Sequence, residues 1–224
     1  MPDAHAPPTA LTADEALAMD RWLVSRGFTL AALMATAGAR VADAARRLAR
    51  ERQLQRAVFL VGPGNNGGDA LVAERLLRGE LETLVWQPLP RAAGADRDPP
   101  PRRVSEAPPL DARTLLVDGL FGVGLARPLE GAARAAVQHV SDSRATVLAI
   151  DVPSGLSATT GEVVGGARGA ALRAHATVTF VAPKTGFFRA AGPEHVGQVY
   201  VVDLGFPPSE LEPWLTARRA GAAT

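Results

Sequence analysis

The chain has 224 residues with 24 Lys or Arg and 23 Asp or Glu, so its net charge is +1. This balance produces no overall field that would attract nucleic acid or a membrane surface, and no apolar run reaches the roughly 20 residues of a membrane span. The absence of cysteine excludes thiolate catalysis, Cys-ligated metals and disulfides, and the opening residues lack the pattern of a signal peptide, so we expect a cytoplasmic protein.

Two helices are predicted at the start of the chain. Thr12 and Glu15 have the spacing of a capping box, and apolar residues then recur at helical period until the break at Gly27. A second helix is expected from about residue 30, with one apolar face that continues to the charged residues 50–52.

After these helices, short apolar runs alternate with helical segments, which is typical of a largely parallel sheet covered on both faces. The expected strands cover residues 57–61, 83–86, 114–117, 146–150, 177–181 and 199–202. The expected helices between them cover residues 69–78 and about 129–140. The predicted fold class is therefore α/β, a three-layer Rossmann-like, mostly parallel sheet preceded by two N-terminal helices.

The whole chain, residues 1–224, is predicted to form one domain, because its length falls within the range of a single α/β unit. Segments 1–10, 88–109 and 216–224 are expected to be flexible, with the C-terminal tail fraying beyond Trp214. Residues 88–109 contain seven of the 18 prolines and show no periodicity. We interpret this segment as a long exposed loop, either a lid or an inert connection.

A glycine-rich turn follows the first predicted strand. Residues 62–69 read Gly-Pro-Gly-Asn-Asn-Gly-Gly-Asp and satisfy the dinucleotide fingerprint of three spaced glycines between a strand and a helix. Such a turn attracts phosphate through its backbone N–H groups. An NAD(P)-dependent oxidoreductase is nevertheless disfavoured, because the second strand ends without a ribose-binding acid and Asp69 would lie beside the pyrophosphate. Alternatively, the two Asn residues merely adopt left-handed conformations and Asp69 caps the helix.

Aspartates recur where apolar strands end. Asp69 ends the turn after the first strand, Asp118 closes the third strand and Asp151 closes the fourth. Ligands of open α/β sheets bind at this carboxyl edge, and burying an unpaired carboxylate there costs on the order of several kcal/mol. A cation, a ligand hydroxyl or a shared proton is therefore expected among the three, although each aspartate alone could instead cap a turn.

Four ordered motifs carry a specific resemblance. GPGNNGGDALVAERLL, DGLFGVGLARPLEG, AIDVPSGLSATTGEV and TVTFVAPKTGFF resemble the NAD(P)H-hydrate epimerase family, also called the YjeF N-terminal domain family. The resemblance extends from LMATAG in the second helix, which is similar to the family's LMENAG, to residues 202–206. Ala35 and Thr36 replace the family's Glu and Asn, and Ala70 stands where glycine is common.

The resemblance implies a substrate, a cation and partners. The substrate is NADH or NADPH hydrated at C6 of the reduced ring, and the cation is one potassium ion per subunit, which suits a set of hard oxygen ligands better than zinc does. A homodimer and functional partnership with an ATP- or ADP-dependent dehydratase are also implied. The family's potassium positions correspond to Asn66, Asp118 and Ser154. Its substrate-binding positions correspond to Asn65, Asn66, Gly67, Gly68, Asp69, Gly122, Val123, Gly124, Leu125, Ala126, Arg127, Pro128 and Asp151.

Asp151 is the predicted catalytic residue. Inversion at C6 needs a proton donor and acceptor, whether the hydroxyl leaves to give an iminium or the ring opens. Lys184, the only lysine, is predicted to contact a phosphate of the substrate or, alternatively, to cap a strand end. A competing hypothesis is a non-catalytic module that binds a ligand, protein or RNA on the same fold, which loss of the strand-end acids would favour.

Overall fold

The computed structural model describes residues 7–91 and 101–221 of the chain. Within them, seven strands form one sheet in the order β3-β2-β1-β4-β5-β6-β7, with every neighbouring pair parallel. The strands are β1 (Arg56–Val61), β2 (Glu82–Trp86), β3 (Arg103–Val104), β4 (Thr114–Gly119), β5 (Thr146–Ile150), β6 (Ala176–Phe180) and β7 (Gln198–Val202). The predicted α/β sheet is confirmed.

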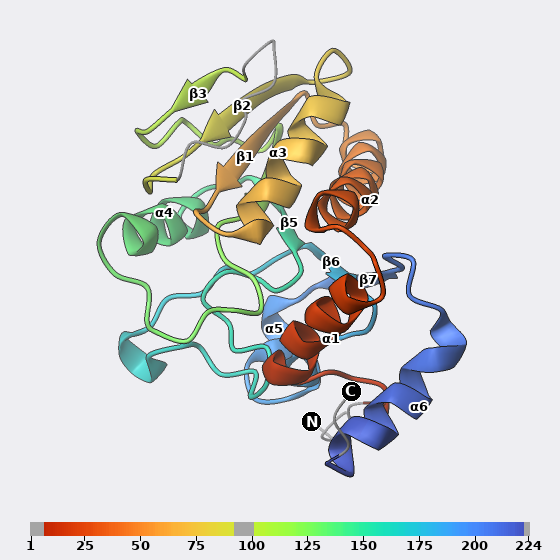
Figure 1. Ribbon diagram of the computed structural model, residues 1–224. Coiled ribbons are helices and arrows are strands. Elements are labelled where there is room, and N and C mark those ends of the chain that lie inside the picture. The colour runs from red at the N-terminus through yellow and green to blue at the C-terminus, as the bar shows by residue number, and fades with distance from the viewer. Residues whose placement is uncertain (1–6, 92–100, 222–224) are drawn as a thin grey trace.

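Helices cover both faces of this sheet (Figure 1). The helices are α1 (Ala13–Ser25), α2 (Leu30–Glu51), α3 (Asn65–Leu77), α4 (Gly131–Ser141), α5 (Gly192–His195) and α6 (Pro208–Arg219), with short 3₁₀ turns at Gly166–Arg168 and Thr185–Phe188. Helices α2 and α3 pack on one face and α4 on the other, whereas α1 and α6 form a separate apolar cluster with Ala182 and Phe206. None of the helices in the described ranges is long and apolar enough to cross a membrane.

The predicted start of the first helix is confirmed in detail. Thr12 Oγ1 accepts a hydrogen bond from the Glu15 amide at 3.2 Å, and Glu15 Oε2 accepts one from the Thr12 amide at 2.8 Å. Helix α1 ends at Ser25, two residues before Gly27, which has a left-handed φ of 97°. Helix α2 then begins close to the predicted position.

Helix α3 differs from its prediction because it begins at Asn65 rather than at Asp69. Most of the glycine-rich turn is therefore the first turn of the helix, with Gly64 as its N-cap. Residues three apart on a helix share one face, so Asn66 and Asp69 point to the same side. The fingerprint pattern predicted the strand and the helix correctly but misplaced the boundary between them.

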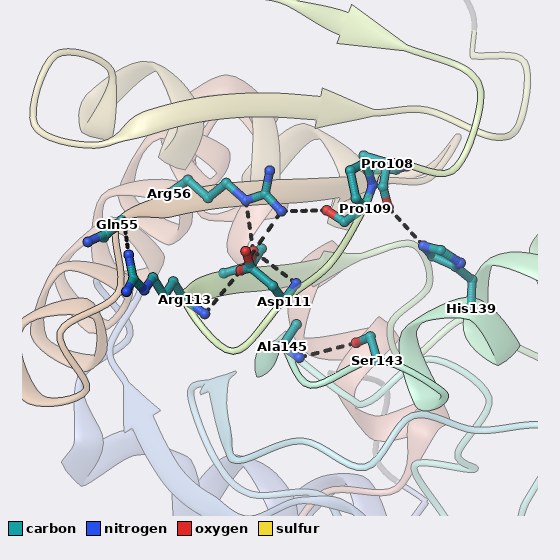
Figure 2. A network of polar contacts seen from close by, with 10 residues as sticks. Gln55, Arg56, Pro108, Pro109, Asp111, Arg113, His139, Ser143 and Ala145 are labelled. Carbon is teal, nitrogen blue, oxygen red and sulfur yellow. Dashed lines mark hydrogen bonds and ion pairs between the residues drawn. The ribbon is translucent and has the colours of Figure 1, made fainter.

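The proline-rich segment is not the wholly irregular loop that its composition indicates. Arg103–Val104 form the edge strand β3, which pairs with β2. At the end of the segment, Arg56 Nη2 donates to the Pro109 carbonyl at 2.5 Å, and His139 Nε2 lies 2.8 Å from the Pro108 carbonyl, as Figure 2 shows. The remaining residues 92–100 lie outside the described ranges.

Both chain ends carry more structure than expected. Helix α6 continues to Arg219, past the point at Trp214 where we expected fraying. The end of α6 is held by contacts with the N-terminal part of the same chain. Arg219 pairs with Glu15 at 2.7 Å and donates to the Ala10 carbonyl at 2.9 Å. Ala10 itself is buried. Residues 1–6 and 222–224, the outer parts of the segments expected to be flexible, lie outside the described ranges.

Close packing against α2 sets the position of α3, the helix that carries Asn66 and Asp69. A Cβ added to Gly38 would lie 2.4 Å from Val72 Cβ and 2.9 Å from the Asp69 carbonyl oxygen. We expect Gly38→Ala to lower the free energy of unfolding by about 1–3 kcal/mol, measured by urea denaturation. Ala35→Ser, on the exposed side of the same helix, is the control and should change it by less than about 0.5 kcal/mol. An unchanged value for Gly38→Ala would contradict tight packing here.

Candidate active site

The candidate site lies where the strand order reverses, between β1 and β4. In open α/β sheets, ligands bind in the crevice at the carboxyl ends of the strands on either side of such a point. The glycine-rich turn follows β1, Asp118 lies near the end of β4, and Asp151 follows β5 directly. The sequence-predicted acids are therefore brought to one edge of the sheet, as their strand-end positions indicated.

The loop after β4 shows how closely the predicted residues converge. A Cβ built on Gly122 would lie 3.1 Å from Asn66 Oδ1 and 3.1 Å from Asp151 Oδ2. The side chains of Asn66 and Asp151, from the first and third motifs, thus both lie beside a glycine of the second motif. Any larger residue at Gly122 would separate or displace them.

Asp118 and Ser154 form a buried, hydrogen-bonded pair. The Ser154 amide donates to Asp118 Oδ2 at 2.8 Å, and Ser154 Oγ donates to Asp118 Oδ1 at 2.6 Å. The Leu120 amide also donates to Oδ1, at 3.2 Å. Burial raises the pKa of Asp118 to about 6, although these hydrogen bonds act in the opposite direction. This pair holds the loop after β4 against the loop after β5.

Asp151 is held from two sides. Its Oδ1 forms an ion pair with Lys184 Nζ at 2.9 Å, and its Oδ2 accepts a hydrogen bond from the Val123 amide at 3.1 Å. Its backbone is left-handed, with φ of 65°, and its amide donates to the Val178 carbonyl at 2.7 Å. This conformation turns the carboxylate out of β5 and towards Gly122, and the two contacts fix its orientation.

The structure corrects the prediction that Lys184 contacts a substrate phosphate. The residue is only 1% exposed, and besides Asp151 its Nζ donates to Thr179 Oγ1 at 2.7 Å. The carbonyls of Phe180 and Ala182 accept from it at 3.2 Å each. A side chain so enclosed is unavailable to an anion at the surface. It instead orients Asp151 and caps the end of β6, which was the alternative interpretation.

Asp69 lies on the same face of α3 as Asn66 and is 7% exposed. Burial is the main reason that its pKa rises to about 8. The negative charges of Asp151 and Asp20 raise it further, and Arg91 opposes them. In neutral solution, Asp69 is therefore largely protonated, and the site contains a carboxylic acid within electrostatic reach of the Asp151 carboxylate.

Asp20 is a site residue that sequence reasoning missed. It lies on α1, and its pKa is raised to about 6, first by burial and then by the charge of Asp151, while Lys184 and Arg21 lower it. Asp20 is exposed to solvent, and its charge interacts with Asp69, Asp151 and Lys184. An acid on an amphipathic helix resembles any solvent-facing residue, so the sequence carried no signal for it.

The remaining predicted residues differ in how far they are exposed to solvent. Asn65 is exposed, whereas Asn66 is half-buried and its Nδ2 has no hydrogen-bond partner in the described structure. Gly67 and Gly68 are buried in the first turn of α3. In the segment 122–128, exposure increases along the chain. Gly122, Val123 and Leu125 are half-buried, and Gly124, Ala126, Arg127 and Pro128 are exposed.

A cavity of about 640 Å³ adjoins the outer part of that segment. Its lining includes Leu125, Ala126, Ser157, Glu162 and Val164.

These features define a parallel α/β domain with aspartates at the carboxyl edge of the sheet, beside its topological switch point. The family model described as YjeF-related protein N-terminus matches residues 30–186. The chain belongs to this family.

Curated relatives agree with this assignment. The chain is 38% identical over 208 residues to the NAD(P)H-hydrate epimerase of Bordetella pertussis, covering 88% of this chain and 89% of that protein. It is 35% identical over 174 residues to the bifunctional NAD(P)H-hydrate repair enzyme Nnr of Thermofilum pendens, covering 70% of this chain and 32% of that protein. The crystal structure of the yeast protein YNL200c shares the fold, with a TM-score of 0.68, 21% identity and coverage of 89% and 94% of the two chains.

The raised pKa of Asp69 predicts a pH-dependent stability. Its folded pKa of about 8 lies above the ordinary value of 3.8, so the native protein retains a proton that the unfolded chain releases. Stability of the ligand-free protein should therefore fall as the pH rises towards 8. Asp69→Asn removes this titration and is expected to raise the free energy of unfolding at pH 8 by roughly 2 kcal/mol or more.

Urea denaturation at several pH values between about 6 and 8.5 measures this effect. Asp20 and Asp118, whose pKa values are about 6, change the free energy of unfolding mainly below this range. Wild-type stability should decrease across the range, and that of Asp69→Asn should change less. Parallel pH profiles of equal stability would show that Asp69 is ionised in the native state.

Proposed function

We propose that this protein is an NAD(P)H-hydrate epimerase that interconverts the R and S forms of hydrated NADH and NADPH. The observation that carries the proposal is a buried acid, Asp69, whose pKa is raised in part by the charge of the lysine-bound Asp151. Asn66, on the same face of α3 as Asp69, meets Asp151 beside Gly122. Membership of the family and the names of the curated relatives support it. The intact acids disfavour a non-catalytic module.

Two acids in different environments supply both proton transfers that inversion needs. In one route, Asp69 protonates the C6 hydroxyl, which leaves as water, and Asp151 accepts a proton from the water that adds to the other face. In the other route, Asp151 accepts the hydroxyl proton while the C6–N1 bond breaks and Asp69 protonates the released vinylogous amide. Reversal after rotation closes the ring with the opposite hand. Both routes conserve electrons, so neither requires an oxidant.

The roles of the other residues follow from their contacts. Lys184 orients Asp151 and stabilises its negative charge. The Val123 amide fixes the second carboxylate oxygen and brings the segment 122–128 around the substrate. Asp20 adds negative charge that favours the protonated form of Asp69. Burial of the centre limits access of bulk water during the reaction.

A potassium ion fits the residues that the resemblance indicates. Asn66 Nδ2 is buried without a partner, while Asn66 Oδ1 shares its surroundings with another acceptor, Asp151 Oδ2. A half-turn of the amide would direct its N–H₂ group towards Asp151 and its oxygen into the unpartnered position. Asn66, Asp118 and Ser154 would then hold the ion with amide, carboxylate and hydroxyl oxygens, which suit a hard cation. The ion would supply positive charge that orients the substrate.

The wider setting is inferred from the relatives. The Thermofilum pendens protein is named a bifunctional repair enzyme, which supports a functional partnership with an ATP- or ADP-dependent dehydratase. We further propose that the chain forms a single domain and works as a homodimer.

The epimerase assignment is tested by substituting Asp151. Separation of the R and S epimers by chiral chromatography follows the rate at which a single epimer of hydrated NADH returns to the equilibrium mixture. Asp151→Asn is expected to lower kcat by about 100-fold or more, because it removes a proton acceptor in contact with the substrate. Asp142→Asn, at the exposed C-terminus of α4, is the matched control and should retain wild-type activity. Retention of most activity by folded Asp151→Asn would refute the assignment.

The cation is tested by stability, independently of activity. Potassium chloride should raise the unfolding temperature of the wild-type protein, with a stabilisation of about 2.7 kcal/mol at a concentration 100 times the Kd. Choline chloride at equal ionic strength should not. Asn66→Ala should lose most of the potassium effect. An equal response of both proteins to both salts would rule out a potassium site at Asn66.

A further inference from the structure

Arg91 lies against the first turn of α3, although it belongs to the proline-rich segment. Its Nη1 donates to the Gly62 carbonyl at 2.9 Å and to the Gly64 carbonyl at 2.5 Å. These two bonds attach the segment that follows β2 to the turn that follows β1. The guanidinium is half-buried by this contact.

Two glycines of α3, which have no side chain, make room for the guanidinium of Arg91. A Cβ on Gly67 would lie 3.0 Å from Arg91 Nη1, and one on Gly68 would lie 3.3 Å from Nη2. The flat group therefore lies on the glycine surface at the start of the helix. Its two bonds to carbonyls fix its plane and leave Nε and Nη2 with three N–H donors. Among the residues that the structure describes, none accepts a hydrogen bond from these donors.

The charge balance at this position calls for an anion. The N-terminus of a helix carries partial positive charge, so an arginine beside it is unfavourable on its own. The nearby acid, Asp69, is buried and largely protonated, which leaves the positive charge only partly compensated. A phosphate at the same place would accept from both the guanidinium and the free amides of the first turn.

Resting on the proposed epimerase function, we propose that Arg91 binds a phosphate of the hydrated dinucleotide over the glycine-rich turn. It takes the role that the sequence indicated for Lys184, which is buried beneath Asp151. Its positive charge also acts on Asp69, which offsets repulsion between that acid and a pyrophosphate. The nicotinamide end then extends inwards towards Asp151, and the proline-rich segment supplies a specificity residue.

Kinetics with two substrates separate phosphate binding from a structural role. The substrates are hydrated NADH and hydrated reduced nicotinamide riboside, which has the reacting ring but no phosphate. Arg91→Ala should raise KM for hydrated NADH about tenfold or more, the effect of losing a charge-assisted contact, and leave kcat within about threefold. KM for the riboside should stay unchanged.

Arg102→Ala is the matched control, because this arginine lies in the same segment with its side chain 75% exposed. It should leave both KM values unchanged. Arg127→Ala tests the other basic residue of the predicted substrate segment. Equal KM values for Arg91→Ala and wild type would overturn the proposal, and so would an equal rise for both substrates, which indicates structural damage. A phosphate-selective loss in Arg127→Ala alone would place the contact there and also overturn it.

Direct binding separates this inference from the proposed function. Calorimetric titration with ADP-ribose, which carries the pyrophosphate but cannot react, measures affinity without turnover. Weaker binding by Arg91→Ala than by wild type and Arg102→Ala supports the phosphate contact, even if the wild-type protein does not epimerise hydrated NADH. Equal affinity of all three proteins refutes the contact, even if the epimerase assay succeeds.

Discussion

The buried ion pair between Lys184 and Asp151 is the interaction on which the rest of the site depends. Removing two charges from water is costly, and here the cost is offset by a 2.9 Å contact and by polar groups that surround the lysine. The pair joins the end of β5 to the chain that follows β6. Because Asp151 also binds the Val123 amide, the same interaction positions the loop after β4.

The chemistry arises from unequal environments at one edge of the sheet. Asp151 forms an ion pair with a lysine and accepts a hydrogen bond from a backbone amide, whereas Asp69 is buried and lies near other negative charges. Environments that favour different protonation states give one acid and one base from two identical side chains. The close crossing of α2 and α3 at Gly38 keeps Asp69 in this position, so packing against the backbone of α3 contributes to the protonation state of the acid.

Much of the architecture could be predicted from the sequence, because strand periodicity, the capping box and the strand-end acids all have local signatures. Convergence of Asp118 and Asp151 followed from the parallel order alone. The partner of Lys184 could not be predicted, since it lies 33 positions earlier in the chain and is selected by the crossing between β5 and β6. Asp20 and Arg91 were missed because neither stands in a motif or at a strand end.

The most direct test of this account is a crystal structure of the protein with hydrated NADH in potassium buffer. We expect the C6 hydroxyl to lie within hydrogen-bonding distance of Asp151 or Asp69, with the two carboxyl groups on opposite faces of the ring. A dinucleotide whose ring contacts neither acid, for example one held only in the cavity beside Leu125 and Glu162, would contradict it.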